Sequence, residues 1–143
     1  MERDIIMNGD LKREIILDNY SHPQNRGIPA TDDYLKINSR NVSCIDNLNI
    51  YLKIENNIIK DIKFEGEACV ISISSTSILT SILKGKTKEE ALNIIDNYQK
   101  MINEEKYDSD VLGDLNVYNE TSKQPSRIKC ATLSANGIEK VLK

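Results

Sequence analysis

The feature that most constrains the fold is a strictly alternating segment, residues 48–55, followed at once by two asparagines. An aliphatic residue occupies every second position from Leu48 to Ile54, so an extended strand here would have one apolar and one polar face. Asn56-Asn57 predicts a two-residue hairpin turn, because asparagine tolerates positive φ better than most residues. The segment is therefore expected to form one half of an antiparallel hairpin with one buried face.

A returning strand is expected at residues 58–65, ended by Gly66, and a weaker alternation at 34–39 predicts a third strand. Three apolar residues of the returning strand would share its buried face: Ile58, Ile62 and Phe64. The three strands together predict an antiparallel meander with one solvated face.

Helical patterns surround this sheet in the sequence. Apolar residues recur at helical spacing in residues 10–20, with Asp10 as the expected N-cap, and again from Pro125 to the C-terminus. Between these, Thr87-Lys88-Glu89-Glu90 is a capping box that opens another helix. Residues 70–83 suit either a strand or a helix, and their length favours a helix that stops at Gly85. The order of these expected strands and helices predicts an α+β fold, with a three-stranded antiparallel sheet and helices packed mainly on one face.

The length of 143 residues predicts one domain spanning 1–143, in which residues 1–9 could form a flexible N-terminus. A net charge of −3 argues against nucleic-acid binding, because phosphate contacts need a concentrated basic surface. No apolar run is long enough to span a membrane, and the first residues carry no signal-peptide pattern. These observations predict a cytoplasmic protein with neither a nucleic-acid nor a membrane partner.

The chain has three cysteines, an odd number that cannot all pair within the chain. Cys44 and Asp46 are two residues apart and would leave the same face of an extended segment. Cys69 stands at an expected helix N-terminus, where the free N–H groups favour a thiolate. Cys130 lies near the start of the last expected helix. Three thiolates and a carboxylate suit tetrahedral Zn²⁺. From the residues alone, three buried cysteines and an unrelated surface aspartate remain an equal alternative.

Four short motifs, in order, resemble those of the SufU-type proteins, relatives of the IscU iron–sulfur scaffolds and of the N-terminal domain of NifU. The resemblance as a whole covers about residues 10–143, and three of the motifs contain the three cysteines. The motifs are Tyr20-Ser21-His22-Pro23-Gln24-Asn25-Arg26-Gly27, Asn41-Val42-Ser43-Cys44-Ile45-Asp46, Phe64-Glu65-Gly66-Glu67-Ala68-Cys69-Val70-Ile71-Ser72 and Ser126-Arg127-Ile128-Lys129-Cys130-Ala131. This chain departs from the family pattern at Val42, where proline is usual, and at Ile45 and Ala68, where glycine is usual.

Two features resemble the SufU branch more than the IscU branch. Lys129, not histidine, precedes Cys130, and polar residues 107–124 form an insertion before the last helix. The resemblance implies a SufE/NifU-like fold and a zinc site of Cys44, Asp46, Cys69 and Cys130. It also implies that Cys44 accepts persulfide sulfur from a PLP-dependent cysteine desulfurase of the SufS type and passes it to downstream cluster-assembly proteins.

Two other functions stay open at this point. The same residues could carry iron as a scaffold on which a [2Fe–2S] cluster is assembled directly, or the chain could be a non-catalytic, zinc-stabilised binding module. Arg127 and Lys129, close to Cys130, could support the site or steer a partner, and a solvated Arg127 is an equal alternative. The sequence leaves open the identity of the desulfurase, the oligomeric state, and whether the sulfur relay counts as an enzyme.

Overall fold

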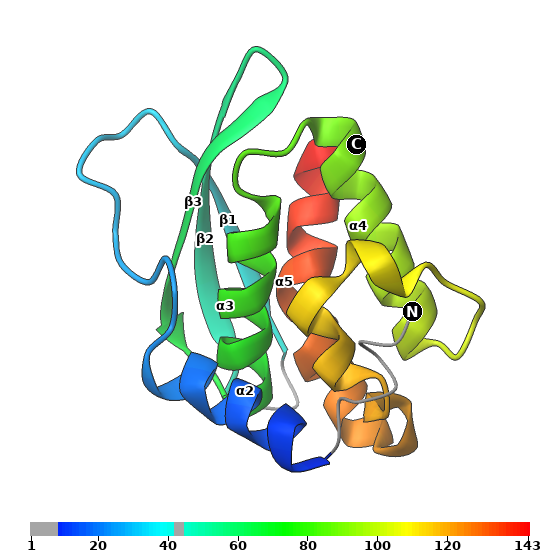
Figure 1. Ribbon diagram of the computed structural model, residues 1–143. Helices are drawn as coiled ribbons and strands as arrows, with labels where there is room; N and C mark the ends of the chain where they lie inside the picture. Colours follow the sequence, from blue (N-terminus) through cyan, green and yellow to red (C-terminus); the bar gives the residue numbers. More distant parts are fainter. Residues whose placement is uncertain (1–8, 42–44) are drawn as a thin grey trace.

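The computed structural model describes residues 9–41 and 45–143, and its centre is a three-stranded antiparallel sheet (Figure 1). The strands are β1 (Leu35–Arg40), β2 (Asn47–Glu55) and β3 (Ile58–Glu67), in the order β1-β2-β3. Both pairings are antiparallel. Helices cover one face of this sheet, so the predicted α+β class is confirmed.

The hairpin between β2 and β3 turns at the two asparagines, as the sequence predicts. Asn56 and Asn57 have φ values of 53° and 67°, the left-handed pair that a two-residue turn requires. A bulge at Lys53/Ile54 then shifts the register, so that Ile59 and not Ile58 is buried in the core. The expectation for Ile58 was wrong, because an inserted residue reverses which side chains face inward.

Strand β3 also continues past its expected end. Gly66 does not stop the strand but pairs with Leu48, at a φ of +135° that side chains rarely adopt. A Cβ atom at this position would overlap the carbonyl oxygen of Asn47, so only glycine fits. The longer strand brings the chain to Cys69 at the end of the sheet where β2 begins.

The α-helices in the described part of the chain are α2 (Gly9–Ser21), α3 (Val70–Leu83), α4 (Lys88–Ile102) and α5 (Pro125–Leu142). Residues 70–83, which suited either a strand or a helix, thus form helix α3. The capping box at Thr87 is confirmed. The Thr87 Oγ1 accepts from the Glu90 N–H at 3.1 Å, and the Glu90 Oε1 accepts from the Thr87 N–H at 2.9 Å. Helix α2 already includes Gly9, so Asp10 lies in its first turn and is not the N-cap.

Residues 107–124 are packed against the helices. They form the short 3₁₀ helices η1 (Ser109–Val111), η2 (Gly113–Tyr118) and η3 (Thr121–Lys123). Four apolar residues of this segment are buried: Leu112, Leu115, Val117 and Tyr118. They anchor the segment to the core despite its polar sequence.

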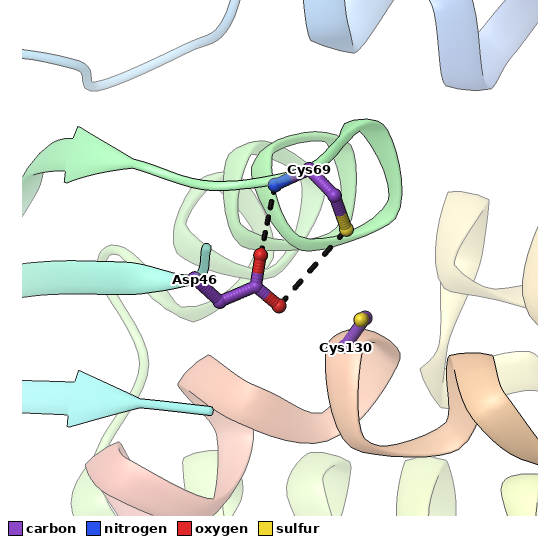
Figure 2. Close-up of side chains that lie close together, drawn as sticks. All are labelled: Asp46, Cys69 and Cys130. Carbon is purple, nitrogen blue, oxygen red and sulfur yellow. Dashed lines mark hydrogen bonds between the residues drawn. The ribbon is translucent and has the colours of Figure 1, made fainter. Parts of the chain in front are cut away.

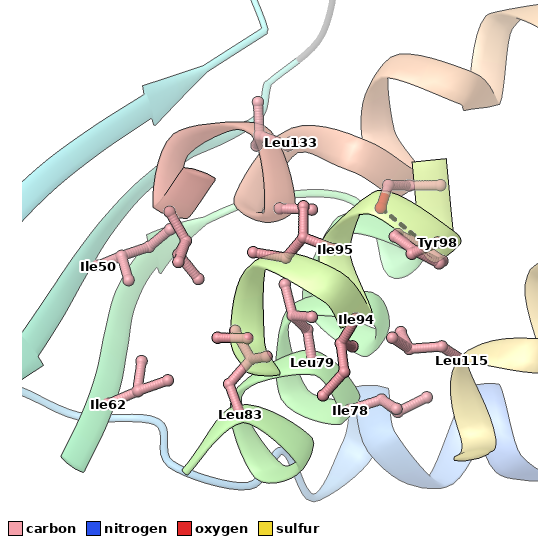
Figure 3. Packing of buried hydrophobic residues seen from close by; sticks show 14 of the residues in the cluster. Ile50, Ile62, Ile78, Leu79, Leu83, Ile94, Ile95, Tyr98, Leu115 and Leu133 are labelled. Atoms are coloured by element: carbon pink, nitrogen blue, oxygen red, sulfur yellow. Dashed lines mark hydrogen bonds between the residues drawn. The ribbon is translucent and has the colours of Figure 1, made fainter. Parts of the chain in front are cut away.

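The core lies between the sheet and the helices, where Ile50 and Ile62 share one cluster with Leu79 and Leu83 of α3 (Figure 3). Helix α3 also buries a row of hydroxyl groups. Ser74 bonds to Tyr118 Oη at 2.5 Å. In residues 9–41 and 45–143 every buried side-chain nitrogen or oxygen has a hydrogen-bond partner. Within the same residues no helix is both long and apolar enough to cross a membrane.

Candidate metal centre

The predicted ligands Asp46, Cys69 and Cys130 come from three separate elements and lie close together (Figure 2). Asp46 directly precedes β2, Cys69 is the N-cap of α3, and Cys130 lies in the second turn of α5. One ligand atom from each residue lies within 4.8 Å of the other two. Residues far apart in the sequence thus form one cluster of two sulfurs and one carboxylate.

The cluster has the size that a zinc ion needs. Zn–S bonds of about 2.3 Å in tetrahedral geometry hold sulfur ligands roughly 3.8 Å apart. Cys69 Sγ is 4.0 Å from Asp46 Oδ2, so the donors need to move by less than about 1 Å to reach that spacing. Two thiols and a carboxylate leave one position of a tetrahedral site for a fourth ligand.

Asp46 is buried, with 1% of its surface exposed, and its carboxylate is held at both oxygens. The Cys69 N–H donates to Oδ1 at 2.8 Å, and the Ser72 hydroxyl donates to Oδ2 at 2.6 Å. Burial pushes the pKa of Asp46 upward, but the hydrogen bonds from Ser72 and Cys69 outweigh it and hold the pKa below its usual value. Asp46 is therefore an anion ready to accept a cation.

Cys130 is 2% exposed and points toward Asp46 and Cys69 (Figure 2). Burial, together with hydrogen bonds to Asp46 and Cys69, raises the pKa of its thiol to about 12. The Asn41 side-chain amide donates to Cys130 Sγ at 3.8 Å. Without a metal this cysteine is a thiol, so metal binding there must release a proton.

Sequence reasoning missed two residues that support the site. The Ser72 hydroxyl lies 2.6 Å from Asp46 Oδ2, 3.1 Å from the Cys130 carbonyl oxygen and 3.6 Å from Cys69 Sγ. Asn41 contacts Cys130 across 89 positions of sequence. Ser72 lies three residues after Cys69 in a helix, which puts both on one face, and it closes the motif of residues 64–72. Asn41 opens the motif of residues 41–46, but nothing in that motif pointed to its contact with Cys130.

The remaining predicted residues lie elsewhere. Cys44 is outside the described residues. Arg127 lines a hollow of about 160 Å³ with residues of α2 and η2, and it makes no ion pair within residues 9–41 and 45–143. Lys129 lines a separate groove between β1 and α5. Ile45, where the family usually has glycine, is exposed beside Asp46.

The fold and the site define a class of protein, and comparisons with known proteins place the chain within it. Residues 11–131 match the family model of the NifU-like N-terminal domain, so the chain belongs to this family. It is 39% identical over 131 residues to the zinc-dependent sulfurtransferase SufU of Bacillus subtilis, covering 91% of this chain and 88% of that protein. It is 34% identical to the iron–sulfur cluster assembly scaffold protein IscU of Thermotoga maritima, covering 91% of each.

Solved structures agree with this placement. A crystal structure from Fervidobacterium islandicum, described as a putative iron–sulfur cluster assembly scaffold protein for the SUF system, matches with a TM-score of 0.81 and 32% identity, covering 91% of this chain and 95% of that one. The N-terminal part of a NifU-like protein from Brucella abortus matches with a TM-score of 0.80 over 98% of this chain and 94% of that one, but at 18% identity it shows the fold alone.

Proposed function

We propose that this protein is a zinc-bearing sulfur acceptor in iron–sulfur cluster assembly. The observation that carries the proposal is the convergence of Asp46, Cys69 and Cys130 within 4.8 Å. The proposed donor of sulfur is a PLP-dependent cysteine desulfurase of the SufS type, and the receivers are downstream cluster-assembly proteins. A cytoplasmic location fits this role and stays a prediction.

Cys44 is the proposed acceptor and the fourth ligand. It is two residues from Asp46 in the sequence, and the Asn41 N–H donates to the Asp46 carbonyl oxygen at 3.1 Å, which joins the chain on either side of it. Zinc, when bound, keeps cysteine ligands deprotonated while lowering their reactivity. Asp46, Cys69 and Cys130 would hold the ion while Cys44 leaves it to react.

The transfer needs no external oxidant or reductant. The freed Cys44 thiolate attacks the outer sulfur of the desulfurase persulfide, and a new S–S bond forms on Cys44. The S–S bond in the donor breaks, and the desulfurase cysteine leaves as a thiolate with the electron pair. Asp46 stays ionised throughout, because the Ser72 and Cys69 hydrogen bonds stabilise its charge.

Two relatives support different forms of this role. The name of the Bacillus subtilis protein supports a zinc-dependent sulfurtransferase, at 39% identity. The name of the Thermotoga maritima protein supports a scaffold, at 34% identity, on which iron would occupy the same donor set. A zinc-stabilised binding module without chemistry is the third candidate, and it differs from both in taking up no sulfur.

Persulfide mapping tests the proposal. The zinc-loaded protein would be incubated with a SufS-type desulfurase and cysteine, alkylated and analysed by peptide mass spectrometry. We expect one added sulfur on Cys44 and a faster desulfurase, and neither effect in Cys44→Ala. Purified protein should be colourless and contain zinc.

Two results would separate the alternatives. Added sulfur on Cys69 or Cys130 but never on Cys44 would overturn the assignment of the acceptor. A brown, iron-containing protein would favour the scaffold, whereas zinc without any sulfur uptake would favour the binding module. Lys106→Ala, an exposed change in the turn after α4, serves as the matched control and should behave as the unaltered protein.

A further inference from the structure

A groove of about 460 Å³ runs between β1 and α5. Four residues of β1 line it. Ile37 and Ser39 face α5, whereas Asn38 and Arg40 alternate with them and face away. Successive strand residues point to opposite faces of a sheet, so a groove lined by both sets follows the edge of the strand. Figure 1 shows β1 on the side of the sheet next to α5.

The two outer edges of the sheet differ. The edge of β3 is covered: the Gly27 N–H donates to the Phe64 carbonyl oxygen at 2.8 Å, and the Phe64 N–H donates to Asn25 at 3.1 Å. The edge of β1 forms no backbone hydrogen bond to another segment within residues 9–41 and 45–143, apart from β2 on its inner side. An open strand edge beside a helix is the geometry in which extended peptides add a strand to a sheet.

The charge of the groove is of one sign. Arg40, Lys129 and Lys140 line it, and no aspartate or glutamate does so among the described residues. None of the three forms an ion pair within those residues. This is unusual for a chain with a net charge of −3, and it favours an anionic occupant.

The dimensions indicate what kind of anion would fit. Lys129 and Lys140 are eleven residues apart on α5, a separation of roughly 16 Å along the helix axis. An extended peptide of about five residues spans the same length. The cations are exposed and spread along the groove, which suits several carboxylates in a row better than one small anion.

The groove also leads to the metal centre. Asn41, at its end, donates to Cys130 Sγ at 3.8 Å, and Lys129 directly precedes Cys130. A partner segment bound along β1 would therefore hold the rest of the partner protein close to the metal centre. No aromatic side chain lines the groove among the described residues, so it lacks the stacking surfaces that single-stranded nucleic acid uses.

We propose that the groove between β1 and α5 docks an extended acidic segment of a partner protein, which pairs with the free edge of β1 and presents its carboxylates to Arg40, Lys129 and Lys140. Binding of such a segment does not depend on sulfur transfer. Its failure and the failure of the proposed function are therefore distinguishable in separate experiments.

The test titrates a peptide of alternating glutamate and threonine, six residues long, into the isotope-labelled, zinc-loaded full chain and follows amide NMR shifts. We expect shifts confined to β1 and the facing side of α5, slower amide exchange on β1, and weaker binding as salt is added. Lys140→Glu should weaken binding by about 3- to 10-fold. Lys106→Glu, the same charge change at an exposed position that does not line the groove, should leave binding unaltered.

Three comparisons make the proposal falsifiable. The same peptide with glutamine for glutamate tests charge, one with proline at alternate positions tests strand pairing, and free glutarate tests a small-anion site. Binding of any of them as tight as that of the acidic peptide would overturn the proposal. Dimerisation of the protein through β1 in place of peptide binding would also overturn it, since the edge would then serve a second copy.

Discussion

Ser72 contacts all three of the candidate ligands in the described part of the chain. Ser72→Ala removes the hydroxyl that holds Asp46 Oδ2, so the orientation of the carboxylate toward the sulfurs is less firmly fixed, although the Cys69 N–H still donates to Oδ1. We expect a folded protein whose zinc affinity falls by about 10- to 100-fold, measured by competition with a chelating dye.

The control for this prediction is Ser75→Ala. Ser75 is also a buried serine of α3, but among residues 9–41 and 45–143 its hydroxyl bonds only the backbone carbonyl of Ser72. If both variants lost zinc affinity equally, the effect would come from the packing of α3 and not from the orientation of Asp46.

Replacing Asp46 should change the zinc-bound site in a different way from replacing Cys44. Asp46→Ala removes one oxygen ligand but leaves every sulfur in place, so we expect weaker zinc binding together with retained, altered sulfur uptake at Cys44. Metal content after dialysis and the rate of persulfide formation measure the two effects. An Asp46→Ala protein that binds zinc as tightly as the unaltered chain would contradict its role as a ligand.

At the residue scale, the sequence could predict that Asp46, Cys69 and Cys130 come together, but it could not predict the contacts that support them. Cys69 and Cys130 are rare residue types whose chemistry suggests a metal, and they do lie together with Asp46. Asn41 and Ser72 are common polar residues, and their contacts with Cys130 and Asp46 depend on how β1, α3 and α5 pack. Packing between distant segments leaves no local pattern in one sequence.

At the scale of the elements, the contact between β1 and α5 depends on Gly137. A Cβ atom there would overlap the hydroxyl of Ser39, so Gly137→Ala should lower the free energy of unfolding by about 1–3 kcal/mol in urea denaturation. Combining it with Ser39→Ala, which removes the obstructing oxygen, should restore part of the loss. Gly9→Ala, which meets no atom within 4 Å, is the control; equal destabilisation by both glycine changes would contradict the account.

The elements also show where periodicity fails as a guide. Alternation identified β2 and the turn at Asn56, because each depends on residues close in sequence. It misplaced Ile58, since the bulge at Lys53/Ile54 arises from pairing between two strands. It ended β3 at Gly66, although that glycine is needed inside the sheet for a close backbone contact.

For the whole molecule, zinc should stabilise a fold that also has a core of its own. The proposed ligands join the start of β2 to α3 and α5, so an ion bound there adds its binding free energy to folding. Removing zinc with a chelator should lower the melting temperature by at least about 5 °C while the apo protein stays folded, measured by circular dichroism. An unchanged melting curve after verified removal would contradict a structural role for the ion.

The central claim is that Cys44, Asp46, Cys69 and Cys130 together hold one zinc ion. X-ray absorption at the zinc edge, on protein purified without added metal, tests it most directly. The account predicts one zinc per chain with three sulfur neighbours at about 2.3 Å and one oxygen at about 2.0–2.2 Å, and one sulfur fewer in Cys44→Ala. A shell of nitrogen and oxygen alone, or an unchanged sulfur count in the Cys44→Ala protein, would contradict it.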